Sequence, residues 1–211
     1  MNIDYKFKFI IIGDSGTGKS SIINRFMDEY YHQDEELNTI GVDFKTKILC
    51  VNKSILKLFI WDTAGQEIYR SIIRNYYNNA IAVILVFSHD DIDSFYNCEK
   101  WIKDIKNSIQ NDNIQIILVG NKIDLESKIN KRDIYNFCDK YKVDYLGVSV
   151  KKNINIDTIF INLSKKILFL KCIDKELFEK LVFGDKHVVS IQKDTTIIKN
   201  LNLTKRCCFI Q

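Results

Sequence analysis

The sequence predicts an α/β fold of three layers, in which a six-stranded, mostly parallel sheet is flanked by about five helices. Strand-like and helix-like segments alternate along the chain, and a glycine-rich loop lies between the first strand-like and the first helix-like segment. The 211 residues, 46% of them hydrophobic, suit one domain with a sizeable core. We place this domain at 5–172 and a flexible tail at 173–211.

The individual elements follow from hydrophobic periodicity. Strands are expected at 7–12, 43–51, 55–61, 80–87, 114–119 and 143–148. Helices are expected at 20–27 and near 67–77, 93–109, 131–141 and 155–170. The short link Asn52-Lys53-Ser54 predicts a hairpin between the second and third strands. After Cys172 the pattern weakens, and we expect a flexible tether with one short amphipathic turn at 175–183.

Composition and charge exclude several classes of protein. The net charge of +4 is a mild excess, which argues weakly for an anionic membrane surface and hardly at all for nucleic acid. The longest apolar run, 80–87, is far shorter than the roughly 20 residues of a transmembrane helix, and no signal peptide is expected. The six cysteines form no C-x-x-C pair, so a structural zinc site is not expected. Their single, scattered positions suit a protein of the reducing cytosol.

The glycine-rich loop is a phosphate-binding loop. Residues 13–20, Gly-Asp-Ser-Gly-Thr-Gly-Lys-Ser, match G-x-x-x-x-G-K-[ST] in the required strand-to-helix setting. The glycines let backbone N–H groups approach phosphate oxygens at a helix N-terminus. Lys19 would place its charge on the β- and γ-phosphates, and Ser20 would offer a hydroxyl to Mg²⁺. The loop alone does not separate ATP from GTP.

Guanine is indicated by Asn121-Lys122-Ile123-Asp124, which follows a predicted strand. A carboxylate at Asp124 can accept hydrogen bonds from N1–H and the exocyclic amine of guanine, whereas adenine has no matching donor pair. Lys122 can lie over the base plane, and Asn121 can brace the neighbouring loops. Ser149-Val150-Lys151 follows the next strand and would close over the base with its backbone N–H groups.

Hydrolysis is indicated by Asp62-Thr63-Ala64-Gly65-Gln66 at the end of another strand. Asp62 would hold Mg²⁺ through water, and the Gly65 N–H could meet the γ-phosphate. Gln66 is suited to orient the attacking water. Thr39 is the candidate second hydroxyl ligand of Mg²⁺.

With these motifs in this order, the chain resembles a small GTPase of the Ras superfamily and, within it, the Rab family. The resemblance rests on 13–21, 39–45 (TIGVDFK), 60–67 (IWDTAGQE) and 120–124 (GNKID), and it covers 5–170 and the last five residues. It implies the P-loop small-GTPase fold, a monomeric GTPase domain, and switch segments near 30–44 and 64–79 that γ-phosphate and Mg²⁺ order.

The expected site residues are then these. Catalysis is assigned to Gln66, Lys19 and Gly65, and the metal to Ser20, Thr39 and Asp62. Nucleotide binding is assigned to Ser15, Gly16, Thr17, Gly18, Lys19, Ser20, Ser21, Tyr31, Thr39, Gly65, Asn121, Lys122, Asp124, Ser149, Val150 and Lys151. The resemblance implies an effector surface of Ile40, Phe44, Trp61 and Tyr76.

Three residues depart from the Rab pattern. Ile68 stands where Rabs usually carry arginine, Ser88 where they carry aspartate, and Val150 where they carry the alanine of S-A-K. None of these departures falls on a residue assigned to catalysis or the metal.

The C-terminus carries a lipidation signal. Cys208-Phe209-Ile210-Gln211 fits C-a-a-X, whose terminal Gln nominally favours farnesyl. The preceding Cys207 and the resemblance to Rabs favour geranylgeranyl groups on both cysteines, delivered with an escort protein. Two chains agree with the rule that stable anchoring needs two signals.

The predicted function is a GTP/GDP switch that hydrolyses GTP slowly and recruits effectors for vesicle trafficking. It would act at the cytosolic face of an endomembrane compartment, with a soluble cytosolic pool. Its expected partners are effectors, an exchange factor, a GTPase-activating protein, the escort protein and a dissociation inhibitor. The alternatives are a guanine-nucleotide-binding module without significant hydrolysis, another Ras-superfamily branch, and a P-loop ATPase or nucleotide kinase. Gln66 and Thr39 argue against the first, and Asp124 argues against the last.

Overall fold

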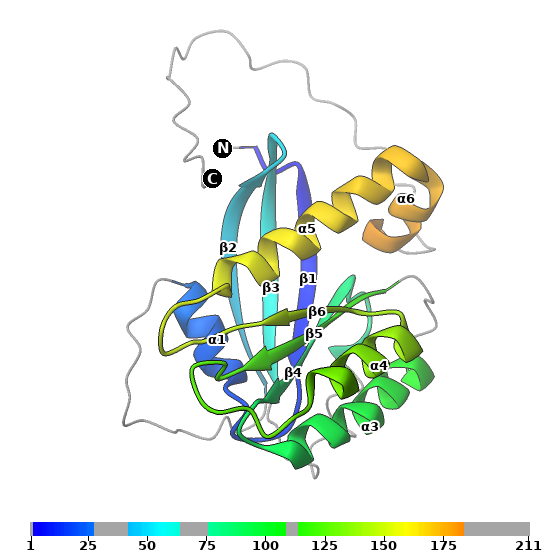
Figure 1. Ribbon diagram of the computed structural model, residues 1–211. Helices are drawn as coiled ribbons and strands as arrows, with labels where there is room; N and C mark the ends of the chain where they lie inside the picture. The colour runs from blue at the N-terminus through cyan, green and yellow to red at the C-terminus, as the bar shows by residue number, and fades with distance from the viewer. Residues whose placement is uncertain (1, 28–41, 64–75, 109–113, 184–211) are drawn as a thin grey trace, which may run out of the picture.

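A six-stranded sheet forms the centre of the computed structural model, which describes residues 2–27, 42–63, 76–108 and 114–183 (Figure 1). The strand order is β2-β3-β1-β4-β5-β6. β2 and β3 pair antiparallel, and all other neighbours pair parallel. The strands are β1 (Tyr5–Ile12), β2 (Val42–Val51), β3 (Ser54–Thr63), β4 (Ala82–Ser88), β5 (Gln115–Asn121) and β6 (Asp144–Gly147). The predicted mostly parallel sheet is confirmed.

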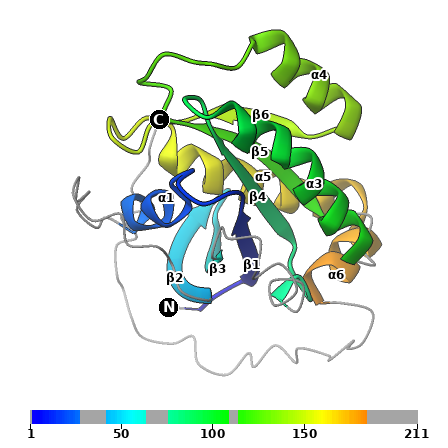
Figure 2. The same cartoon turned by 90° about the horizontal axis from the view of Figure 1, so that it is seen from below.

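Helices cover both faces of this sheet. The described helices are α1 (Lys19–Phe26), α3 (Ile92–Ser108), α4 (Lys131–Tyr141), α5 (Ile156–Ile173) and α6 (Lys175–Phe183). The first, α1, packs with α5 and α6 into the core on one face, and α3 packs with α4 into the core on the other (Figures 1 and 2). The helix expected near 67–77 lies almost wholly outside the described residues.

The central strands are apolar on both sides because both faces are covered. In β1, Phe7 and Phe9 point into the core beneath α5, whereas Ile10 and Ile12 point into the core beneath α3. Side chains alternate across a strand, so a strand between two helical layers becomes a continuous hydrophobic run. The same holds for β4, in which every residue is buried. This is why the buried strands were predictable from the sequence.

The predicted hairpin is also confirmed. Strand β2 ends at Val51, β3 begins at Ser54, and these two residues face each other in the ladder. The two residues of the turn, Asn52 and Lys53, have φ values of 49° and 67°. Left-handed values at both positions match the twist of the strands, and asparagine adopts them more readily than most residues.

The described part of the segment after Cys172, up to 183, is packed rather than a flexible tether, and the predicted amphipathic turn at 175–183 coincides with a helix. Helix α5 continues to Ile173, and Asp174 then caps a second helix, α6, by accepting a hydrogen bond from Leu177 N at 2.9 Å. Phe178 is only 2% exposed and meets the ring of Tyr5 edge-on, with centroids 5.3 Å apart. The packed part of the chain therefore continues through α6. No helix in the described segments has the length and apolarity needed to cross a bilayer.

The burial of Phe178 leads to a prediction about stability. Phe178→Ala should lower the free energy of unfolding by about 3 kcal/mol, because it removes a buried aromatic ring and leaves a cavity. Urea unfolding of the GDP-loaded full chain measures this. The matched control is Phe169→Ala on α5, whose ring is 61% exposed and should matter little. Equal effects of the two substitutions would contradict the packing of α6.

Candidate functional site

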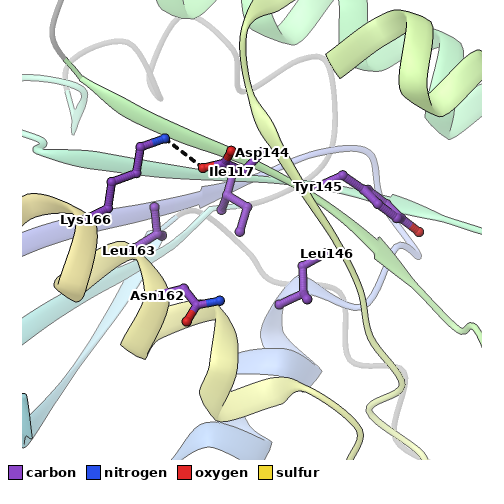
Figure 3. Close-up of a pocket in the computed structure, with 7 residues that line it drawn as sticks. All are labelled: Ile117, Asp144, Tyr145, Leu146, Asn162, Leu163 and Lys166. Atoms are coloured by element: carbon purple, nitrogen blue, oxygen red, sulfur yellow. Dashed lines mark hydrogen bonds and ion pairs between the residues drawn. The ribbon is translucent and has the colours of Figure 1, made fainter. Parts of the chain in front are cut away.

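The sequence motifs meet at one edge of the sheet. Strands β1, β3, β4, β5 and β6 run parallel, so their carboxyl ends lie along the same edge. The P-loop leaves β1 there, and Asp62 and Asn121 lie at the ends of β3 and β5. In open α/β sheets ligands bind beyond the carboxyl ends of the strands. A small crevice lies between β6 and α5, and Asp144 and Lys166 pair there at 2.7 Å (Figure 3). It is separate from this edge because Asp144 is the first residue of β6, at the amino end of the strand.

Two glycines shape the P-loop. Gly13 has a φ of 138°, and a Cβ placed on it would lie 2.1 Å from the carbonyl oxygen of Val86. Gly18 has a φ of 88° and immediately precedes α1, and a Cβ there would lie 2.3 Å from Nδ2 of Asn121. The side chains missing from these positions leave room for β4 and for the guanine motif to approach the loop.

Lys19 of the P-loop is buried. It is only 5% exposed, and its Nζ donates a hydrogen bond to the carbonyl oxygen of Asp14 at 2.7 Å. Burial lowers the pKa of Lys19 to about 8, although Asp62 and Asp14 oppose this shift. An ammonium group in such a place is stabilised by a nearby anion, so the site favours a negatively charged ligand such as phosphate.

Ser20 and Asp62 offer oxygen atoms to a metal. Ser20 lies in the first turn of α1, and its Oγ donates a hydrogen bond to Oδ2 of Asp62 from the end of β3. Asp62 is 7% exposed. A hydroxyl and a carboxylate are the hard ligands that Mg²⁺ prefers, so these residues fit that ion. Thr39, the other predicted ligand, lies outside the described residues.

Asn121 joins the P-loop to both predicted base-binding loops. Its Nδ2 donates to the carbonyl oxygen of Thr17 at 2.9 Å, and its Oδ1 accepts from Lys122 N at 2.8 Å and Val150 N at 3.4 Å. The side chain is 2% exposed. The bracing expected of Asn121 is therefore present, and it brings residues from three separate motifs together.

The two loops predicted to bind the base also contact each other directly. Ser149 is fully buried, and its Oγ donates a hydrogen bond to Oδ1 of Asp124. The same Oγ accepts from Lys152 N at 3.0 Å. Ser149 thus fixes the orientation of the carboxylate predicted to recognise guanine. Lys122 has a left-handed φ of 63°, and its Nζ lies 3.3 Å from Oδ2 of Asp90.

Three of the four predicted effector-surface residues lie in one aromatic row. The centroids of Phe44 and Trp61 are 5.4 Å apart, and those of Trp61 and Tyr76 are 5.1 Å apart. Phe44 is 54% exposed. The other predicted residues that lie outside the described part of the chain are Tyr31, Ile40, Gly65, Gln66, Cys207 and Cys208.

The contact between the P-loop and α3 was not predicted from the sequence. Oδ2 of Asp14 accepts a hydrogen bond from Asn97 Nδ2 at 2.6 Å, and its Oδ1 accepts one from Trp101 Nε1 at 2.7 Å. Asp14 therefore holds Lys19 through its backbone carbonyl while α3 holds its carboxylate. The only signal in the sequence was Asp14 itself. A carboxylate inside a phosphate-binding loop needs hydrogen-bond donors around it to be stable there.

This contact predicts that α3 helps to hold the nucleotide. Trp101→Phe keeps an aromatic ring but removes the donor to Asp14, and it should speed GDP dissociation about three- to tenfold because a hydrogen bond to a charged group is lost. Stopped-flow release of a fluorescent GDP analogue measures the rate. Trp61→Phe is the matched control, since Trp61 Nε1 has no hydrogen-bond partner among the described residues. Equal rates for the two variants would refute the role of Trp101.

Comparison with known proteins agrees with this geometry. The family described as "Ras family" matches residues 8–169. The chain is 40% identical over 166 residues to "Ras-related protein Rab-1D" of Dictyostelium discoideum, covering 78% of this chain and 80% of the relative. It is 34% identical over 210 residues to "Ras-related protein RABE1d" of Arabidopsis thaliana (97% and 93% covered), and 35% identical over 207 residues to "GTP-binding protein YPTM1" of Zea mays (97% and 97%). The chain therefore belongs to the Ras family and, within it, is a Rab-like small GTPase, a GTP-hydrolysing enzyme.

Proposed function

We propose that this GTPase is a magnesium-dependent switch whose GTP form recruits effectors to the cytosolic face of an endomembrane compartment for vesicle trafficking. The observation that carries the proposal is the position of Asn121, whose side chain contacts the P-loop and the 149–151 loop at once. Phosphate and base sites that share one buried side chain suit a single nucleotide lying across them.

The P-loop would bind the phosphates and the two other loops the base. Backbone N–H groups of the P-loop and the N-terminus of α1 would face the phosphates, and Lys19 would add its charge. Asp124, oriented by Ser149, would accept hydrogen bonds from N1–H and the 2-amino group of guanine. Tyr31 would pack against the edge of the base.

Ser20, Thr39 and Asp62 would hold Mg²⁺, with Asp62 acting through water. The ion, when bound, offsets negative charge on the β- and γ-phosphates. The chain's own share of the chemistry is positioning and charge: Lys19 stabilises the phosphates, the Gly65 N–H meets the γ-phosphate, and Gln66 orients the attacking water.

Hydrolysis by the protein alone should be slow. No arginine stands at Ser15 or in 30–44, so none is placed there to stabilise the transition state from within the chain. A rate constant well below ~1 s⁻¹ is expected until an activating protein adds groups worth ~10³–10⁵-fold. An exchange factor would then restart the cycle.

Membrane attachment would come from geranylgeranyl groups on Cys207 and Cys208. An escort protein would deliver the chain to the prenylating enzyme, and a dissociation inhibitor would keep a cytosolic pool. Residues 173–211, which include the packed helix α6, hold seven Lys or Arg and five Asp or Glu, too balanced to supply a polybasic second signal. Two lipid chains would supply it instead.

Effectors would bind the aromatic row beside the predicted switch segment near 30–44. Phe44 stacks on Trp61, Trp61 contacts Tyr76 at a tilt, and Phe44 exposes more than half of its surface. Ile40 precedes β2 and would extend this surface. Exposed aromatic residues contribute strongly to binding at protein interfaces.

Single-turnover hydrolysis tests the switch. Purified protein with Mg²⁺ should hydrolyse GTP slowly and ignore ATP, and Gln66→Leu should slow the basal rate at least about tenfold, because the attacking water loses its orienting group. Gln192→Leu, the same substitution in the tail, should leave the rate unchanged. Tight GTP binding without any turnover would instead favour a binding module. An unchanged rate in Gln66→Leu would remove the role assigned to Gln66.

Serine substitutions test the lipid anchor. Prenylation with the escort protein should attach two geranylgeranyl groups, shown by intact mass, and Cys207→Ser or Cys208→Ser should each leave one. Each single variant should release most of the protein from vesicles, since one chain binds only marginally. A single farnesyl group on Cys208, with normal binding of Cys207→Ser, would refute the two-chain anchor.

A further inference from the structure

The segment after β4 carries an unusual histidine. Ser88, His89 and Asp90 follow one another where the resemblance to Rabs leads one to expect aspartate at the first position. His89 is only 7% exposed although it lies in a connecting segment. His89 has no part in the proposed nucleotide or metal site.

His89 joins the two ends of the guanine-recognition loop, which we define as residues 121–128. Its N–H donates to the carbonyl oxygen of Asn121 at 2.9 Å, and its own carbonyl accepts from Lys128 N at 2.8 Å. Its ring Nδ1 lies 2.7 Å from Oγ of Ser127. Both ends of the loop that contains Lys122 and Asp124 therefore bond to this one residue.

The other side of the ring reaches β6. Nε2 of His89 lies 2.8 Å from the hydroxyl of Tyr145. Tyr145 turns its ring away from Leu163 and Lys166 of α5 (Figure 3), toward the core on the α3 side. β6 leads within a few residues to Ser149, the partner of Asp124. His89 thus connects the two segments that form the base site.

The hydrogen bonds assign the protonation of the imidazole. Ser127 uses its hydroxyl proton to bond the carbonyl oxygen of Ile129 at 3.0 Å, so it accepts from Nδ1–H of His89. Nε2 is then the acceptor for the hydroxyl of Tyr145. Burial lowers the pKa of His89 and raises the pKa of Tyr145 to about 12, so the neutral imidazole and the protonated phenol both persist at neutral pH.

Gly120 makes room for this bridge. A Cβ on Gly120 would lie 2.6 Å from Nε2 of His89 and 2.9 Å from the hydroxyl oxygen of Tyr145. The histidine ring also packs against Phe87, with centroids 5.2 Å apart. The imidazole is therefore held in one position by contacts on several sides.

Asp90 adds a second link from the same segment. Its Oδ1 accepts a hydrogen bond from Ser88 Oγ, and its Oδ2 pairs with Nζ of Lys122 at 3.3 Å. Ser88 and Lys122, with the backbone of Asp90, also lower the pKa of this carboxyl despite its partial burial, which keeps it charged. The lysine predicted to lie over the base is thus restrained at its far end.

We propose that the segment Ser88–Asp90 positions the guanine-recognition loop, with His89 as the residue that ties this loop to β6. The inference rests on the proposed roles of Lys122 and Asp124 in binding guanine. His89 touches neither nucleotide nor metal in this scheme and acts through the residues that do. Loss of the bridge should loosen the hold on the base more than the hold on the phosphates.

Dissociation rates of GDP and IDP from the full-length protein test this. IDP keeps the phosphates and N1–H but lacks the 2-amino group that Asp124 would recognise. His89→Phe keeps a buried ring, removes both hydrogen bonds, and should speed GDP release about tenfold. IDP release should rise less, so the preference for GDP over IDP should fall. Tyr145→Phe should show the same pattern.

A double-mutant cycle separates the bridge from general loosening. If His89 and Tyr145 act through one hydrogen bond, the double variant should release GDP no faster than His89→Phe alone. The matched control is Tyr141→Phe on α4. It removes a hydroxyl that donates to Glu99 at 2.8 Å, lies outside the base loops, and should leave both rates unchanged. Tyr145→Phe also keeps the test decisive if His89→Phe does not fold.

Three results would overturn the inference: equal acceleration of GDP and IDP release, no acceleration of either, or independent effects in the double variant. Failure of the proposed function would look different. In that case the unmodified protein would show no preference for GDP over ADP, and the His89 proposal would end with it.

Discussion

The amide of Asn121 is the contact on which the whole site depends. Its two ends bond to the P-loop and to the loop after β6, and the side chain is almost completely buried. A buried amide with good partners is stabilising, whereas one left unsatisfied is costly, so this side chain holds the loops in a single arrangement. Gly18 allows the approach, because a Cβ there would collide with this amide. The predicted base and phosphate sites are therefore held together by one side chain.

Much of this arrangement was predictable from the sequence, and the reason is physical. The central strands are buried on both faces, so β1 and β4 are long apolar runs, and each motif follows directly after such a run. In a parallel sheet the carboxyl ends share an edge, which brings sequence-distant motifs together. The Asn52-Lys53 turn was equally predictable, because asparagine adopts the left-handed backbone that such turns need.

Other features left no pattern in the sequence. Asp14, Asn97 and Trp101 are far apart in the chain, and only the fold brings the donors on α3 to the P-loop. One histidine such as His89 forms no sequence pattern by itself, so its four hydrogen-bonded neighbours could be identified only from the structure. The sequence predicted a short amphipathic turn at 175–183, where α6 lies, but not its packing on the core, because no glycine or proline separates it from α5 and its two buried side chains are too few to establish a period.

Residues 175–183, predicted to be part of the tether to the proposed lipid anchor, pack on the folded body as α6. From Phe183, the last described residue, about 25 residues lead to Cys208, and even fully extended they span at most about 90 Å. A tether starting at Ile173 would have allowed roughly 40% more. Lipid groups on the last cysteines would therefore confine the GTPase domain to a shallower layer above the bilayer. A protein anchored in the proposed way could reach only a partner lying within that layer.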